Sequence, residues 1–228
     1  MKMEIGRSFT YIMEDQDWAK KVLLGGAITL IPIVGPFFAM GYVIEVMRNV
    51  IAGQETPLPA LDDFGGKLVE GLKMWVIAFV YALPLVLLMM CAQSGSLVPA
   101  LAGNLDPDVF QALTMLSLGV SVCFGCLLLL YSILMGLILP FALGRYAETG
   151  EFGAALRVGE FFGMLKDNVG PAIIVLLVNG LAASAAMLVG TIACGVGIFF
   201  TMFYAQLVMA FLYGALYRQA AVPRSAQL

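Results

Sequence analysis

The chain of 228 residues is 61% hydrophobic and 12% charged, whereas a soluble domain carries about 45–50% apolar and about 25% charged residues. One globular core of this length cannot bury such an excess, so lipid must surround much of the surface. The net charge of −3 and the lack of basic clusters mixed with aromatic residues exclude nucleic acid as a partner. In lipid, an isolated apolar segment satisfies its backbone hydrogen bonds only as a helix, so we expect an all-α, polytopic integral membrane bundle.

The residue types that serve most enzymes are scarce. Histidine is absent, which removes the commonest general base and metal ligand. The sequence contains no Gly-rich phosphate loop, nucleophile elbow or HExxH motif. Cys123 and Cys126 lie three residues apart on one helix face, and with no second pair nearby we interpret them as packing residues. We therefore expect no enzymatic activity, no metal site and no cofactor.

A single membrane domain is predicted for residues 1–220, followed by a polar tail at 221–228. The segment 112–143 is too long for a perpendicular crossing, because its residues rise about 1.5 Å each and the hydrocarbon core is about 30 Å thick. We expect that segment to tilt or to protrude. The domain contains five or six hydrophobic segments, namely 22–31 with 36–47, 74–91, 112–143, 171–191 and 197–217.

The first hydrophobic segment is interrupted by Pro32, Gly35 and Pro36. Two prolines within five residues remove backbone donors and clash with the preceding turn. Two interpretations follow. Residues 22–44 form one kinked helix that crosses once, or two arms at about 17–31 and 36–51 form a re-entrant hairpin.

Basic residues favour the re-entrant hairpin. The 93–111 connection has no Lys or Arg, so we expect it outside, while 45–73, 145–170 and the C-terminal tail carry basic residues and belong in the cytoplasm. The N-terminus has four basic residues before the first segment and is expected on the same side. Only a hairpin places every basic segment in the cytoplasm.

Three stretches place apolar residues at helical spacing opposite mixed charge, at 5–13, 61–72 and 152–165. This pattern is typical of amphipathic helices. We expect three helices on the cytoplasmic surface, either packed on the ends of the spans as connectors or in contact with lipid.

Several short motifs carry a resemblance to a known family. They are Asp17-Trp18 with Lys20-Lys21, Leu30-Ile31-Pro32-Ile33, Gly41-Tyr42, Arg48 with Gly53, Leu58-Pro59, Asp62-Asp63 and Gly71-Leu72-Lys73. Over about the first 90 residues the chain resembles the uncharacterised prokaryotic membrane family called domain of unknown function 4013, although Ala60 stands where an aromatic residue is expected. The resemblance implies a multi-pass protein of a bacterial or archaeal cytoplasmic membrane and supplies no catalytic residues.

Four polar residues are the candidates for a functional site. Glu45 and Arg48 lie three residues apart at the end of an apolar arm, where they can pair on one helix face. Ionisable groups at membrane depth are functional candidates, although an interfacial salt bridge explains this pair as well. Asn179 and Gln206 lie inside the last two spans and either hydrogen-bond each other as interhelical glue or line a polar path.

Small residues recur at every fourth position, at Ala182, Ala186 and Gly190. Such stripes allow close helix approach, inside one bundle or at a dimer face. Together with the scarcity of polar groups at membrane depth, they favour a non-enzymatic scaffold or accessory subunit. Its expected partners are membrane lipid, another membrane protein or a second copy. The alternative is a small-solute transporter or channel, because broken helices near the midplane form binding sites in many transporters.

Overall fold

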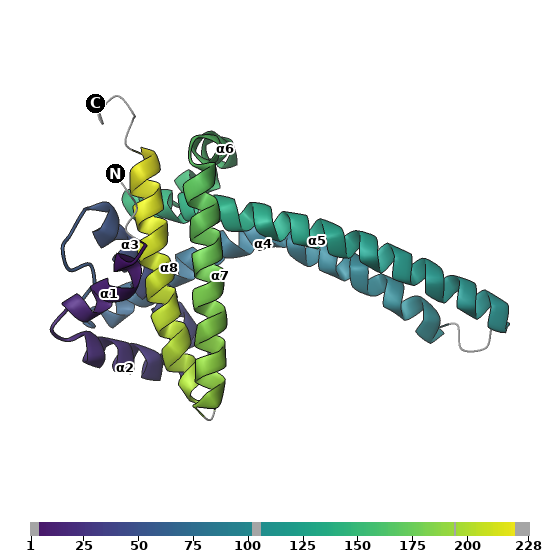
Figure 1. Ribbon diagram of the computed structural model, residues 1–228, viewed down its shortest axis with the longest axis horizontal. Helices are drawn as coiled ribbons and strands as arrows, with labels where there is room; N and C mark the ends of the chain where they lie inside the picture. The colour runs from purple at the N-terminus through teal and green to yellow at the C-terminus, as the bar shows by residue number, and fades with distance from the viewer. Residues whose placement is uncertain (1–4, 102–105, 194, 222–228) are drawn as a thin grey trace. The chain divides into compact units, whose positions relative to one another are not determined.

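The computed structural model describes residues 5–101, 106–193 and 195–221, with the backbone alone for 94–101. Within these ranges the chain is all-α and contains no strand (Figure 1). The helices are α1 (Arg7–Glu14), α2 (Trp18–Thr29), α3 (Val34–Ile51), α4 (Phe64–Leu101), α5 (Pro107–Thr149), the 3-10 helix η1 (Phe152–Leu156), α6 (Val158–Asp167), α7 (Val169–Ile192) and α8 (Gly197–Ala221). The predicted polar tail lies almost wholly outside the described residues, as does Cys194.

Five of the described helices are long and apolar enough to cross a membrane. They are α3, α4 over Phe64–Gln93, α5, α7 and α8. The predicted class, a helical membrane bundle, is confirmed by these elements. Two of these helices are longer than the apolar segments that predicted them. The segment 74–91 lies inside α4, which has 38 residues, and 112–143 lies inside α5, which has 43 residues and continues through Pro140.

The contacts divide the chain into two compact units, Met1–Ile77 with Leu137–Leu228, and Ala78–Gly136. The single domain predicted for 1–220 remains a prediction. We refer to the two parts as the core unit and the hairpin unit. The core unit contains α1 to α3, the start of α4, the end of α5, and η1 to α8. The hairpin unit contains the rest of α4 and α5.

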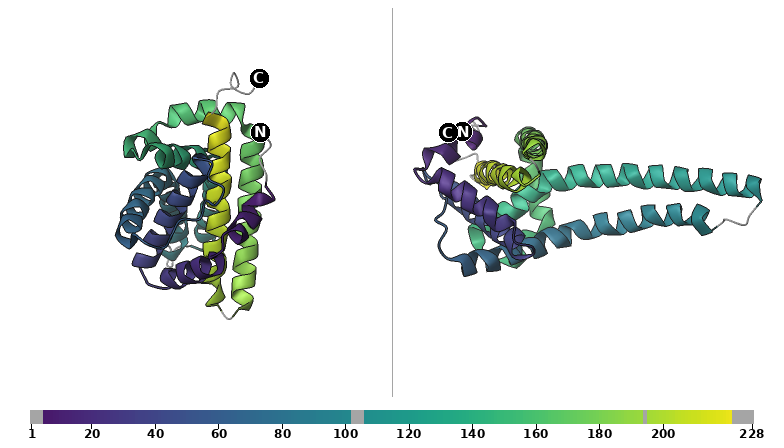
Figure 2. Two further views of the ribbon diagram at one scale, coloured as in Figure 1. Left: turned by 90° about the vertical axis from the view of Figure 1, so that its left-hand side faces the viewer. Right: turned by 90° about the horizontal axis from the view of Figure 1, so that it is seen from below.

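Helix α8 is the centre of the core unit. It contacts α1, α2, α3, α6 and α7, and the right-hand view of Figure 2 shows the yellow α8 between the green α7 and the purple N-terminal helices. Its buried side is built from large apolar side chains such as Phe203, Leu207 and Leu212. At the other side of the contact, Gly25 and Gly26 on α2 face the rings of Phe203 and Phe200.

Helices α3 and α4 cross in the core unit at two glycines. A Cβ atom on Gly41 would overlap the backbone of Lys67, and one on Gly71 would overlap the backbone of Phe37. Each glycine therefore faces the main chain of the other helix, which is how small residues permit close packing in membranes. Helix α4 begins at Phe64 because an Asp63 carboxylate oxygen accepts the Gly66 N–H at 3.0 Å as a cap.

The predicted break of the first hydrophobic segment separates α2 from α3. Helix α2 ends at Thr29 and α3 begins at Val34, and Ile33 between them has a φ of 69°. Gly35 is required here, because a Cβ atom would collide with the backbone of Ile28 and Thr29. The two helices therefore fold back on each other through a tight turn that begins two residues earlier than the Pro32–Pro36 motif alone suggests.

Of the three amphipathic helices that were predicted, two are separate short helices and the third is not. Helices α1 and α6 are short helices in the expected regions, the latter preceded by η1. The prediction of a separate surface helix at 61–72 is wrong, because α4 runs without interruption from Phe64. No proline stands between the charged face of 62–70 and the apolar run that follows, and α4 continues through Gly71, so the two patterns join in one helix.

The hairpin unit consists of two antiparallel helix segments. Residues of α5 that are partly covered recur at spacings of three and four, at Leu113, Ser117, Ser121, Phe124, Leu128 and Tyr131. Tyr131 donates its hydroxyl to the Tyr81 carbonyl oxygen at 2.7 Å and ties the two segments together. The opposite side of α5 exposes large apolar residues such as Met115 and Leu130.

Candidate functional site

The charged residues of α3 and α4 meet in the core unit. Glu45, on α3, pairs with Lys67 of α4 at 3.0 Å and not with Arg48. The Lys67 side chain is 4% exposed, and its ammonium group also donates to the Asp62 carbonyl oxygen at 2.8 Å. Lys67 is thus a buried cation whose donors have partners, as a buried charge requires.

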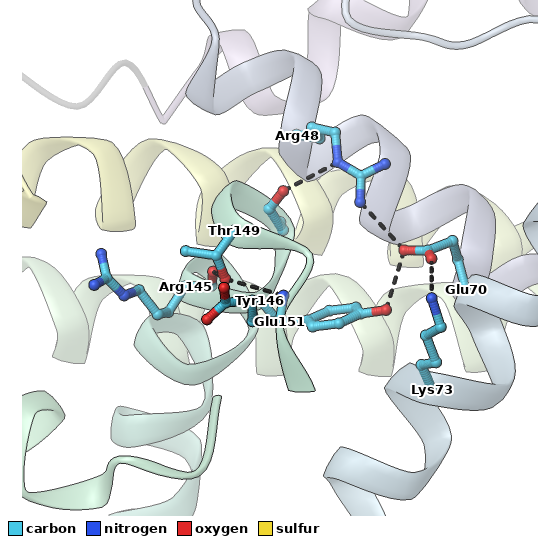
Figure 3. A network of polar contacts seen from close by, with 8 residues as sticks. Arg48, Glu70, Lys73, Arg145, Tyr146, Thr149 and Glu151 are labelled. Carbon is cyan, nitrogen blue, oxygen red and sulfur yellow. Dashed lines mark hydrogen bonds and ion pairs between the residues drawn. The ribbon is translucent and has the colours of Figure 1, made fainter. Parts of the chain in front are cut away.

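Arg48 belongs to a neighbouring network centred on Glu70. Figure 3 shows the Glu70 carboxylate between Arg48, Lys73 and the hydroxyl of Tyr146. Arg48 lies 3.2 Å away, the Tyr146 hydroxyl donates at 3.1 Å and Lys73 at 2.9 Å. Arg48 also donates from Nε to the Ala147 carbonyl oxygen at 3.0 Å. The network therefore joins α3, the start of α4 and the end of α5.

A second polar group lies at the end of α5, facing α8. The Tyr217 hydroxyl donates to Glu148 at 2.5 Å, and Arg145 pairs with Glu148 at 3.2 Å. The Nε atom of Arg145 is buried without a hydrogen-bond partner. Thr149 donates back to the Arg145 carbonyl oxygen and accepts the Glu151 N–H (Figure 3). These contacts fix the end of α5 on α8.

An open groove of about 420 Å³ runs along the first network. It is lined by Gly41, Glu45, Arg48, Asp63, Gly65, Gly66, Lys67, Val69 and Glu70. On its walls Glu45 pairs with Lys67 at 3.0 Å and Glu70 pairs with Arg48 at 3.2 Å, while Asp63 caps helix α4. The groove has the chemistry of an ion-pair clamp between helices, and its three acids exceed its two bases by one. We call Glu45, Arg48, Lys67, Glu70 and Tyr146 the charged clamp.

The structure places Asn179 and Gln206 on adjacent helices, α7 and α8. The Oε1 atom of Gln206 is buried and accepts no hydrogen bond, so the predicted bond from Asn179 to this oxygen is not formed. Gln206 therefore keeps a buried acceptor without a partner in the core unit. Glu45 and Arg48 thus line the same groove, whereas Asn179 and Gln206 share only neighbouring helices.

Sequence reasoning missed three members of the charged clamp, Lys67, Glu70 and Tyr146. The sequence contains a partial indication of these residues, because charged residues recur every three positions, at Lys67, Glu70 and Lys73, just before an apolar run. The partner helix was not readable from spacing, because the pairs span 22 to 99 positions of sequence. Among the residues that the structure describes, no three Cys, Asp or Glu side chains gather as a metal would require.

The family assignment rests on a comparison with protein-family models. The model described as "Protein of unknown function (DUF4013)" matches residues 24–195. The chain belongs to this family. The DUF4013 match extends well past the motifs near the N-terminus and includes α3 to α7, so the hairpin unit and the charged clamp lie within it, whereas α1, the start of α2 and α8 lie outside it. No curated protein and no solved structure matches the chain.

Proposed function

We propose that this DUF4013 protein is a non-enzymatic membrane scaffold or accessory subunit that binds another membrane protein through helices α4, α5 and α7. The observation that carries the proposal is the contrast in burial among the candidate spans. In their most apolar windows 56% of α3 and 44% of α8 is buried, against 17% of α4, 6% of α5 and 17% of α7. Two spans therefore form the core, and three offer apolar faces to lipid or to a partner.

The charged residues support the same proposal. Their pairs join α3 to α4 and α4 to α5, and four of the five charged residues that line the groove are paired with each other. A catalytic site needs groups left available for a substrate, such as an unpaired base or nucleophile. The clamp uses its groups internally, which suits a part whose role is to hold helices in place.

Site-specific photo-crosslinking in native membranes tests this proposal. A photoreactive residue would replace Leu116 or Leu130, which are 65% and 63% exposed on α5. Leu181, 72% exposed on α7, reports the second predicted face, and the matched control is the buried Leu207 on α8. The proposal expects one discrete protein adduct from exposed positions and none from Leu207. Lipid adducts alone at every exposed position would count against it.

A small-solute transporter is the second candidate, favoured by two observations. The broken connection between α2 and α3 and the unpaired Gln206 oxygen both belong to the core unit, and transporters place broken helices and polar groups around their substrates. Solute flux into vesicles that is lost in Gln206→Leu and Asn179→Leu, with both variants folded, would favour this candidate over the scaffold.

A further inference from the structure

A second hollow lies in the core unit, between the N-terminal helices and the α7–α8 hairpin. Its volume is about 400 Å³. The wall consists of Phe9, Val22, Ala182, Ala185, Ala186, Val189, Phe200, Thr201, Tyr204 and Ala205. Ala182 and Ala186 belong to the small-residue stripe, but in this stripe only Ala186 and Gly190 are buried by α8. Ala182 instead contributes open space to the hollow.

The hollow offers no free hydrogen-bond donor. Its two hydroxyl groups both face backbone carbonyls: Thr201 lies 2.7 Å from the Ala186 oxygen, and Tyr204 lies 2.8 Å from the Phe9 oxygen. Next to it, burial raises the pKa of Tyr11 well above its ordinary value, and its hydroxyl donates to the Leu207 carbonyl oxygen. Apolar space without polar partners does not hold water, so the occupant must be apolar.

The size of the hollow favours a chain over a helix. One turn of α-helix with its side chains measures about 10 Å across and about 5.4 Å along the axis, and so fills about 400 Å³ by itself. A partner helix that crosses the membrane has several turns, most of which would remain outside. A flexible hydrocarbon chain can lie along an apolar groove. The small side chains of the alanines in the wall leave room for such a chain.

The surroundings supply such chains. The hollow lies beside α7 and α8, which are both candidate spans, and the outer side of α7 exposes Leu181, Leu188 and Ile192 by 72%, 68% and 84%. Val189, in the wall, is 56% exposed and next to Leu188 in sequence. The hollow is open on one side, and its walls would forfeit dispersion contacts if it stayed empty. We propose that the hollow binds one acyl chain of a membrane phospholipid; the site does not depend on the protein partner proposed above.

The test uses the full chain alone in vesicles of palmitoyl-oleoyl phosphatidylcholine. The probe is phosphatidylcholine with a diazirine in one acyl chain, added at low mole fraction, and adducts are mapped by mass spectrometry of peptides. We expect adducts on α7 to concentrate at Ala182, Ala185 and Ala186, above the level at the more exposed Leu188. Val189→Phe fills the hollow and should reduce these adducts several-fold. Leu188→Phe is the matched control and should leave them unchanged.

A second variant and two possible results can contradict acyl-chain binding in the hollow. Ala185→Phe fills the hollow from another position and should repeat the loss if Val189→Phe folds poorly. Labelling that follows exposure along α7 and ignores Val189→Phe would overturn the proposal, because the hollow would then be ordinary lipid-facing surface. Crosslinks between two copies at these alanines, in place of lipid adducts, would overturn it as well. The partner proposal is untouched by either result, because no partner is present in the vesicles.

Discussion

The ammonium group of Lys67 on α4 lies 3.0 Å from a carboxylate oxygen of Glu45 on α3. The two residues meet because the helices cross at Gly41 and Gly71, where each main chain contacts the other. Lys67 is 4% exposed whereas Glu45 is 37% exposed, so the pair has one buried and one accessible member. The crossing and the ion pair are thus parts of one contact.

Glu45→Gln should lower the free energy of unfolding by about 1–2 kcal/mol. A fully buried pair loses roughly 3–5 kcal/mol when one member is removed, but Glu45 is partly exposed and Lys67 keeps its bond to the Asp62 carbonyl oxygen. The control is Asp62→Asn: that carboxylate is 80% exposed and lies 3.8 Å from Lys67, so its loss costs at most about 1 kcal/mol. Thermal unfolding in detergent compares the two, and equal losses would contradict the buried-pair account.

Gly41→Ala and Gly71→Ala should each separate α3 from α4. The added methyl group meets the backbone of the other helix, which cannot rotate away as a side chain would, so we expect a loss toward the upper end of the roughly 1–3 kcal/mol typical of overpacking. Gly65→Ala, at the start of the same helix, meets no atom within 4 Å and should be neutral or slightly stabilising. Folded yield and Tm check the series; a Gly41→Ala protein as stable as the wild type would show that the crossing is looser.

Glu70→Gln should cost more stability than Tyr146→Phe. Glu70 anchors three partners, Arg48, Lys73 and Tyr146, and hydrogen bonds to charged groups are worth about 1.5–3 kcal/mol each. Removing the carboxylate charge weakens all three, so we expect about 2 kcal/mol. Tyr146→Phe removes a single bond to the carboxylate and leaves its pairs with Arg48 and Lys73, so it should cost about 1.5 kcal/mol, the lower end of that range. Unfolding of both variants in detergent measures the order, and a reversed order would remove Glu70 from the centre of the network.

Periodic patterns were sufficient for the class and for most elements of this fold. The long apolar runs predicted the spans α4, α5, α7 and α8, and Pro32 with Pro36 predicted the separation of α2 from α3. The patterns failed at 61–72, where amphipathic and apolar stretches join in α4, because periodicity alone marks faces and not ends. Helix ends depend on local caps, such as the Asp63 carboxylate that starts α4 at Phe64.

The sequence identified some residues of the candidate site by their type, but it did not identify the residues with which they pair. Glu45 and Arg48 are members of the charged clamp, but each binds a residue of α4 that no spacing in α3 reveals. Tyr146 was visible only as an aromatic residue next to Arg145, just after the apolar run 112–143. Its role follows from the fold, which places the end of α5 beside Glu70. The apolar hollow was equally hidden, because its wall combines four helices.

Two contacts of the N-terminal residues predict the membrane side of the first helices. Arg7 donates to the Glu55 carbonyl oxygen at 3.3 Å, and Lys21 donates to the Leu58 carbonyl oxygen at 3.2 Å. The N-terminus thus lies beside the α3–α4 connection, which is expected in the cytoplasm from its basic residues. Helix α2, with 12 residues, rises about 18 Å and is too short to cross. These features favour the re-entrant hairpin.

Cysteine labelling in intact cells measures this topology. Ser8 is buried and would hide a thiol, so Gln16→Cys is the better N-terminal reporter, with Asp108→Cys for the opposite side; both positions are exposed. In a background without native cysteines, we expect an impermeant reagent to label Asp108→Cys and to spare Gln16→Cys. Labelling at both positions would mean that the α2–α3 segment crosses the membrane once.

The mass of the protein extracted from native membranes in polymer nanodiscs tests the central proposal most directly. A scaffold or accessory subunit should be found with a second polypeptide in a fixed ratio, and Glu70→Gln, which loosens the core unit, should reduce that fraction. The Asp62→Asn protein is the matched control and should keep its partner. Recovery of a stable single chain with lipid alone, in wild type and variants alike, would contradict the proposal.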